Sequence, residues 1–203
     1  MPTLLVRELM GSTPNPRRRS EESRHAILSA CLTLIQEGRH RLTIEAIAKQ
    51  AGVGKQTIYR WWPSLGAVLL DAVTEERDRW AVSFENTGDL VHDLSNLLSR
   101  VAEQMSRADQ TPIIRAVIAQ SQVDEALRRA FEDAVFGPMR ASYAQRLRIA
   151  RSTGELSSPL TDDDLLDLAF GPLWFRLLTR PDAMSTDFGR AIAESLRTTI
   201  SPA

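Results

Sequence analysis

Hydrophobic side chains recur at helical spacing along most of the chain. Between Ser20 and Gly38 the apolar residues form one stripe, which predicts an amphipathic helix. We expect Ser20 to cap the start of this helix and Gly38 to end it. The stripe consists of Ile27, Leu28, Cys31, Leu32 and Ile35. Cys31 is therefore expected in the core as a small apolar residue.

Later segments repeat this spacing, and no stretch alternates with period two for long enough to predict a strand. Pro138 and Pro172 interrupt two apolar helical patterns. Because proline lacks an amide hydrogen, each should kink or divide its helix. We expect an all-α fold of about nine helices. The further helices are predicted over residues 65–80, 90–105, 111–119, 124–136 and 188–200.

Residues 43–62 have the spacing of a helix-turn-helix. They read TIEAIAKQAGVGKQTIYRWW, which predicts one helix from Thr43, a turn at 52–54 and a second helix from Lys55. Ala48 is small where the two helices approach each other, and Gly52 can adopt the left-handed conformation that ends the first helix. The side chain of Thr43 can cap the first helix and contact a phosphate.

The second helix of this motif carries hydrogen-bond donors and flat rings on its outer face. Its N-terminal residues suit the edges of bases in the major groove, whereas Tyr59 and Trp61 suit the sugar-phosphate backbone. The alternative is an ordinary helical hairpin whose glycine marks a turn and whose aromatic residues are core. The expected DNA contacts are Thr43, Gly54, Lys55, Gln56, Thr57, Tyr59, Arg60 and Trp61.

With the preceding helix and Pro63-Ser64, this stretch resembles the DNA-binding domain of the TetR/AcrR family of regulators, over about residues 20–75. The resemblance rests on Thr43, Ile47-Ala48, Ala51-Gly52-Val53, Thr57, Ile58-Tyr59 and Trp61-Trp62. It implies a three-helix domain whose third helix lies in the groove, then a fourth helix leading to an effector domain. Leu65 stands where the family usually has a lysine, so a common phosphate contact is missing, which Arg60 or a basic arm could replace.

Charge is distributed unevenly along the chain, although the net charge is only −1. Residues 1–70 hold ten Lys and Arg against five Asp and Glu, and residues 71–203 hold fifteen against twenty-one. A basic front end suggests contact with a polyanion. Arg17-Arg18-Arg19 could follow phosphates or enter the minor groove, or could be a solvated tail. We expect a flexible basic leader at 1–19, a helix-turn-helix domain at 20–65 and a helical ligand-binding and dimerisation domain at 66–203.

The segment 170–178 is apolar on nearly every side, so its helix must be covered on more than one face. One cover is its own domain, and we expect the other to be a second subunit. The resemblance implies that the last helix joins this segment in a four-helix dimer contact; a core helix in a monomer is the alternative. The expected contact residues are Leu165, Leu168, Phe170, Trp174, Phe175, Leu178, Phe188, Ile192 and Leu196.

The resemblance also implies that the remaining helices surround a small-molecule pocket. These side chains suit a plain core equally well, because aromatic residues and methionine occur at helical spacing in every helical domain. The candidate lining residues are Met105, Ile118, Phe131, Phe136, Met139, Tyr143 and Trp174.

Other chemistries find little support in the sequence. Cys31 is the only cysteine, which excludes an intrachain disulfide and is typical of a reducing cytoplasm. The three histidines are scattered, so we expect neither a metal site nor a cofactor. The acidic run 162–164 with Asp167 could suggest a cation site, but a helix start capped by Thr161 explains it better. We expect no enzyme, no signal peptide and no membrane helix.

The sequence therefore predicts a cytoplasmic homodimeric transcriptional regulator. We expect a repressor that leaves a palindromic operator when a small molecule binds. The alternative is an architectural or activating DNA-binding protein, or an adaptor whose acidic half binds another protein. An architectural protein would bind many sites with little sequence preference.

Overall fold

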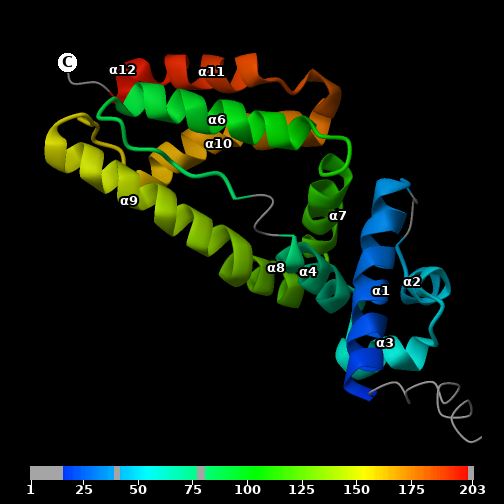
Figure 1. Ribbon diagram of the computed structural model, residues 1–203. Coiled ribbons are helices and arrows are strands. Elements are labelled where there is room, and N and C mark those ends of the chain that lie inside the picture. The colour runs from blue at the N-terminus through cyan, green and yellow to red at the C-terminus, as the bar shows by residue number, and fades with distance from the viewer. Residues whose placement is uncertain (1–15, 39–41, 77–80, 201–203) are drawn as a thin grey trace, which may run out of the picture.

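The computed structural model describes residues 16–38, 42–76 and 81–200 of the 203-residue chain. These residues form helices and their connections, without a strand (Figure 1). The all-α prediction is confirmed for this part of the chain. Within the same residues, no helix combines the length and the apolar character needed to cross a bilayer.

Four helices make up the N-terminal part: α1 (Pro16–Gln36), α2 (Ile44–Ala51), α3 (Lys55–Trp61) and α4 (Leu65–Glu75). The prediction that Ser20 caps the first helix is wrong, because α1 already begins at Pro16, and proline is favoured in the first turn of a helix. Residues 16–19 therefore belong to α1 and not to the leader, whereas residues 1–15 lie outside the described residues. Helix α4 ends at Glu75, and the predicted continuation to Trp80 runs into residues 77–80, which are also outside them.

The C-terminal part consists of α6 (Leu90–Ser106), α7 (Thr111–Ser121), α8 (Glu125–Phe131), α9 (Gly137–Thr153), α10 (Asp162–Thr179), α11 (Thr186–Ser195) and α12 (Arg197–Ile200). A π-helical turn, Glu132–Phe136, joins α8 to α9 just before Pro138. By contrast, α10 is not divided at Pro172. The predicted last helix over 188–200 is divided at Leu196 into α11 and α12.

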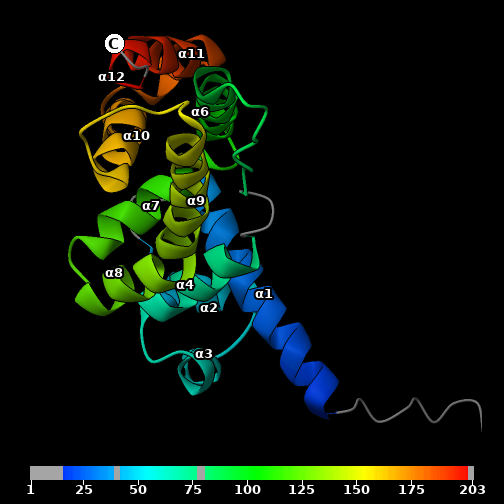
Figure 2. The same cartoon turned by 90° about the vertical axis from the view of Figure 1, so that its left-hand side faces the viewer.

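The helix-turn-helix formed by α2 and α3 lies far from the last helices. Helix α3 is at one end of the molecule, and α11 and α12 are at the other, in both views (Figures 1 and 2). Helix α11 lies along α6. Apolar side chains of α6, α9, α10 and α11 form one core at that end.

A second core joins the two predicted domains. It contains the apolar faces of α1 to α4 together with Ile113 and Val117 of α7 and Leu127 and Phe131 of α8. Helix α4 touches α8 closely at Gly66, where a Cβ atom would lie 2.5 Å from Asp124 Oδ2 and 3.3 Å from Leu127 Cβ. The predicted boundary near residue 65 therefore coincides with the start of α4 but not with a gap between cores.

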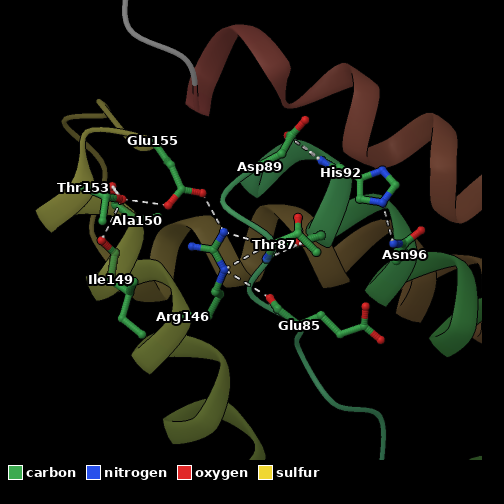
Figure 3. A network of polar contacts seen from close by, with 11 residues as sticks. Glu85, Thr87, Asp89, His92, Asn96, Arg146, Ile149, Ala150, Thr153 and Glu155 are labelled. Atoms are coloured by element: carbon green, nitrogen blue, oxygen red, sulfur yellow. Dashed lines mark hydrogen bonds and ion pairs between the residues drawn. The ribbon is translucent and has the colours of Figure 1, made fainter.

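Polar contacts hold residues 85–87, just before α6, in place (Figure 3). The Arg146 guanidinium on α9 donates to Asp93 Oδ2 of α6 at 2.7 Å and to Glu155 Oε2 at 2.7 Å. Arg146 Nε also donates to the backbone oxygen of Glu85. The Thr87 hydroxyl donates to Asp93 Oδ1 at 2.6 Å. These bonds attach residues 85–87 to α6 and α9.

Candidate DNA-binding surface and effector cavity

The turn between α2 and α3 follows from local capping. Thr43 Oγ1 accepts a hydrogen bond from the Ala46 amide at 3.1 Å, which satisfies a free donor of the first turn of α2. Gly52 ends α2 with φ of 67°, a left-handed conformation that glycine adopts without a Cβ penalty. The Val53 amide donates back to the Ala48 carbonyl at 3.0 Å. Lys55 is then the first residue of α3, as the sequence predicts.

The inner face of α3 is fixed by one aliphatic and one aromatic residue. Ile58 is fully buried, and Trp62, which caps the C-terminus of α3, is buried beside α4. Trp62 Nε1 donates to Asp71 Oδ2 of α4 at 3.0 Å, and the same oxygen accepts from Arg24 of α1 at 2.8 Å. Arg24 also bonds Glu75. Sequence reasoning did not find this contact, because Arg24 and Asp71 are far apart in the chain.

The outer face of α3 carries the predicted DNA-contact residues. Tyr59 exposes 54% of its surface and Trp61 exposes 37%. Gly54, just before α3, is exposed and provides no side-chain cap, and Thr43 and Thr57 are half-buried. The other three expected contacts are exposed: Lys55, Gln56 and Arg60.

An ion pair across the turn holds Lys55. Lys55 Nζ donates to Glu45 Oε1 of α2 at 2.9 Å. This hydrogen bond raises the pKa of the Lys55 ammonium group and lowers the pKa of the Glu45 carboxyl group. The cation is therefore retained at neutral pH, and a carboxylate stands beside the expected base-contact residues. The sequence analysis did not assign Glu45 a role, although Glu45 and Lys55 face each other across the motif.

A cavity of about 500 Å³ lies in the C-terminal part, between α6, α8, α9 and α10. Most of the predicted lining residues border it: Met105, Phe131, Phe136, Met139, Tyr143 and Trp174. Ile118 is half-buried, packs against the C-terminal core and does not line the cavity, so its prediction is corrected. Phe170 and Gln110 also border the cavity, and the sequence analysis gave neither residue this role.

Aromatic rings form much of the cavity wall. The rings of Phe136 and Trp174 meet edge to face with centroids 5.6 Å apart, and Phe131 meets Phe136 at 4.9 Å. Tyr143 stacks on Phe170 at 5.4 Å and donates its hydroxyl to the Val82 carbonyl at 3.1 Å. Burial raises the pKa of Tyr143 to about 12, so its hydroxyl group remains protonated at neutral pH.

Comparison with known proteins covers both parts of the chain. Residues 27–72 match the family described as bacterial regulatory proteins, tetR family, and residues 84–196 match the tetracyclin repressor-like C-terminal domain. The uncharacterized HTH-type transcriptional regulator YdeS of Bacillus subtilis is 32% identical, over 86% of this chain and 87% of its own. The chain belongs to the TetR family.

Two further TetR-family proteins agree with this assignment. The crystal structure of the TetR family transcription regulator SCO0332 is 32% identical, with a TM-score of 0.65, and the match covers 89% of this chain and all of that one. The DNA-binding transcriptional repressor TetR of Mycobacteroides abscessus is 26% identical over 91% of this chain and 97% of its own. The protein is thus a DNA-binding transcriptional regulator.

In this TetR-family chain, only part of the predicted dimer contact is exposed. Leu168, Phe175 and Leu178 of α10 expose 46%, 64% and 49% of their surfaces. Trp174 is half-buried at the cavity, and Phe188 is half-buried beneath the Arg176 guanidinium group, 3.1 Å from the ring centroid. The remaining four predictions are corrected, because these side chains fill the core of their own protomer: Leu165, Phe170, Ile192 and Leu196.

The structure also shows the surroundings of Leu65 and of the acidic run at the start of α10. Leu65 starts α4 and packs against the N-terminal core, so this position carries no charge. Thr161 caps α10 in a reciprocal capping box with Asp164, and Arg140 bonds Asp163 and Asp167. Among the described residues, no group of three or more His, Cys, Asp and Glu is placed to hold a metal ion.

Proposed function

We propose that this TetR-family regulator is a homodimeric, cytoplasmic repressor that binds a palindromic operator and is released by a small-molecule effector. The observation that carries the proposal is the two-sided character of α3. Ile58 and Trp62 attach one side to the protein, while Tyr59 and its polar neighbours face outward. The named repressor among its relatives supports the direction of regulation. The proposal involves no catalytic step and no cofactor.

In the proposed complex, the N-terminal turn of α3 reads the bases. Lys55, Gln56 and Thr57 contact base edges directly or through water, because side chains at this end of a recognition helix reach the major groove. The other contacts go to the sugar-phosphate backbone, which orients the protein: Thr43, Gly54, Tyr59, Arg60 and Trp61. Arg17-Arg18-Arg19 would add phosphate contacts and a steeper salt dependence.

The exposed face of α10 supports a dimer. Leu168, Gly171, Phe175 and Leu178 are all exposed and recur at three- and four-residue spacing, which places them on one side of the helix. A symmetric pair of such faces buries them against each other. The two copies of α3 would then contact half-sites about 34–36 Å apart, one helical turn of DNA.

Release follows if the effector prefers a different spacing of the two recognition helices, since a ligand shifts an equilibrium only by its differential affinity. Phe131 could link the cavity to the recognition helix, because it borders the cavity and also belongs to the core that contains α3 and α4.

The deciding experiment measures binding of the full-length protein to the DNA upstream of its own gene. Footprints are recorded at two salt concentrations with unrelated competitor DNA. We expect a protected palindrome, which Lys55→Ala and Tyr59→Ala abolish while both variants remain dimeric. Val123→Ala, an exposed apolar residue between α7 and α8, is the matched control. Binding to many sequences with a steep salt dependence would contradict a repressor and favour an architectural protein.

A further inference from the structure

Gln110 has a largely buried side chain whose amide group bonds no other described residue of the protein. Only 8% of its surface is exposed, at the start of α7, and it borders the effector cavity. Within residues 16–38, 42–76 and 81–200, no hydrogen bond is made by its side chain, although its backbone bonds Arg107 and Ile114. Among the described residues, the fully buried polar atoms without a partner are Arg146 Nη1 and Arg176 Nε, so the Gln110 amide remains accessible from the space that it borders. The side chain therefore has free donor and acceptor atoms at the wall of a mainly apolar space.

The rest of the cavity wall limits what could bind there. Its described lining includes aromatic rings from α8 to α10 but no carboxylate. A cationic ligand would therefore find no carboxylate counter-ion and would meet the positive charge of Arg100 at the same wall. Arg100 is the one charged residue among the described lining residues, and it is half-exposed and paired with Glu85 at 3.3 Å. An anionic ligand would have to compete with this carboxylate.

We propose that the cavity binds an uncharged, flat aromatic molecule whose carbonyl or hydroxyl group hydrogen-bonds the Gln110 side chain. The proposal rests on the proposed function, because it identifies the chemical class of the effector. The aromatic walls bind the rings of the ligand edge to face or stacked. The Gln110 amide fixes its orientation.

The position of Gln110 also connects the ligand to the DNA-binding part. Gln110 borders a second, open groove between α1, α4 and the start of α7. There, Gln36 Nε2 of α1 donates to the Asp109 carbonyl at 3.0 Å, one residue before Gln110. A ligand bonded to Gln110 would therefore act on the turn that contacts α1.

The test uses four naphthalenes that differ in one substituent. These are 2-acetylnaphthalene, its oxygen-free isostere 2-isopropenylnaphthalene, anionic 2-naphthoate and cationic trimethyl(2-naphthyl)ammonium. Dissociation constants are measured by equilibrium dialysis with the full-length protein and without DNA. We expect the ketone to bind most tightly. Gln110→Leu should weaken ketone binding about 2- to 10-fold, the value of one neutral hydrogen bond, and leave the alkene unaffected.

Gln122→Leu is the matched control, because Gln122 is exposed at the other end of α7. If Gln110→Leu does not fold, as judged by helical circular dichroism, Gln110→Met replaces it.

Three outcomes would overturn the inference. They are tighter binding of either charged naphthalene, an equal effect of the Gln110 and Gln122 substitutions, or no binding of any probe up to its solubility limit. Because DNA is absent from this assay, these outcomes leave the operator footprint untouched. Conversely, a ketone preference without a footprint would support the ligand class and contradict the repressor proposal.

Discussion

Arg146 donates to Asp93 at 2.7 Å, and both side chains are almost completely buried between α6 and α9. Removing Asp93 leaves the buried guanidinium group with Glu155 as its remaining carboxylate partner and deprives the Thr87 hydroxyl group of its acceptor, and breaking such a buried pair is strongly destabilising. Asp93→Ala should therefore lower the free energy of unfolding by about 3–5 kcal/mol, measured by urea denaturation. Asp187→Ala, which breaks an exposed pair with Arg190, is the control and should change stability little. Similar effects of both substitutions would argue against a structural role of the buried pair.

The same pair predicts a loss of stability in acid. Burial by itself raises the pKa of Asp93, but hydrogen bonds from Thr87 and Arg146 outweigh it, so the pKa lies below its usual range. Because the folded-state pKa is below the unfolded-state value of about 3.9, Asp93 stabilises the fold above that pH. This contribution disappears as the pH falls through the folded-state pKa. Urea denaturation from pH 6 down to about pH 2 should show a shallower acid slope for Asp93→Asn than for wild type.

Glu45 should oppose DNA binding. Its carboxylate pairs with Lys55 and stands beside the phosphates of the proposed complex. Glu45→Gln removes this repulsion and frees the ammonium group, so affinity for unrelated DNA should rise several-fold at low salt and less at high salt. The affinity is measured by fluorescence anisotropy with labelled DNA of unrelated sequence at both salt concentrations. Glu194→Gln removes an exposed carboxylate on α11 that pairs with Arg197, and it should leave the affinity unchanged. A rise there would indicate a general effect of net charge.

The exposed face of α10 should hold the proposed dimer together. Phe175→Glu places a charge in the middle of this face, where burial without a partner is costly. We expect the molar mass measured by light scattering to fall from dimer to monomer at micromolar concentration. Val123→Glu makes the same substitution at a residue that is 79% exposed elsewhere and should remain dimeric. A Phe175→Glu dimer as stable as wild type would place the interface on another surface.

Cys31 should be inert in the folded protein. Burial raises the pKa of its thiol to about 12, so the reactive thiolate is scarce at pH 8. Ellman's reagent should release no colour from the native protein within minutes and one equivalent after unfolding in guanidinium chloride. Rapid reaction of the native protein would show that α1 opens readily.

The sequence predicts best those features that depend on residues close together in the chain. The start and end of α2 follow from Thr43 and Gly52, because capping acts within a few residues. In contrast, α10 is apolar on nearly every side. Whether Leu165 or Leu168 faces outward therefore depends on which helices cover α10, which periodicity does not reveal.

The site residues follow the same rule. The adjacent Trp61 and Trp62 were recognisable as a pair, but their different exposure depends on Asp71 in the next helix. Gln110 has no local signature at all, since an unpaired amide is defined only by what surrounds it in three dimensions. The sequence therefore predicts which side chains of α3 are exposed, but the lining of the cavity only in part.

The core shared across the two parts has a consequence for engineering and for evolution by recombination. Because Leu127 and Phe131 of α8 complete the packing of α1 to α4, these four helices are not a freely exchangeable module. A chimera that joins residues 1–65 to a foreign C-terminal half would lose this packing unless the host provides matching side chains. Successful transplants should therefore carry the inner faces of α7 and α8 along with the recognition helix.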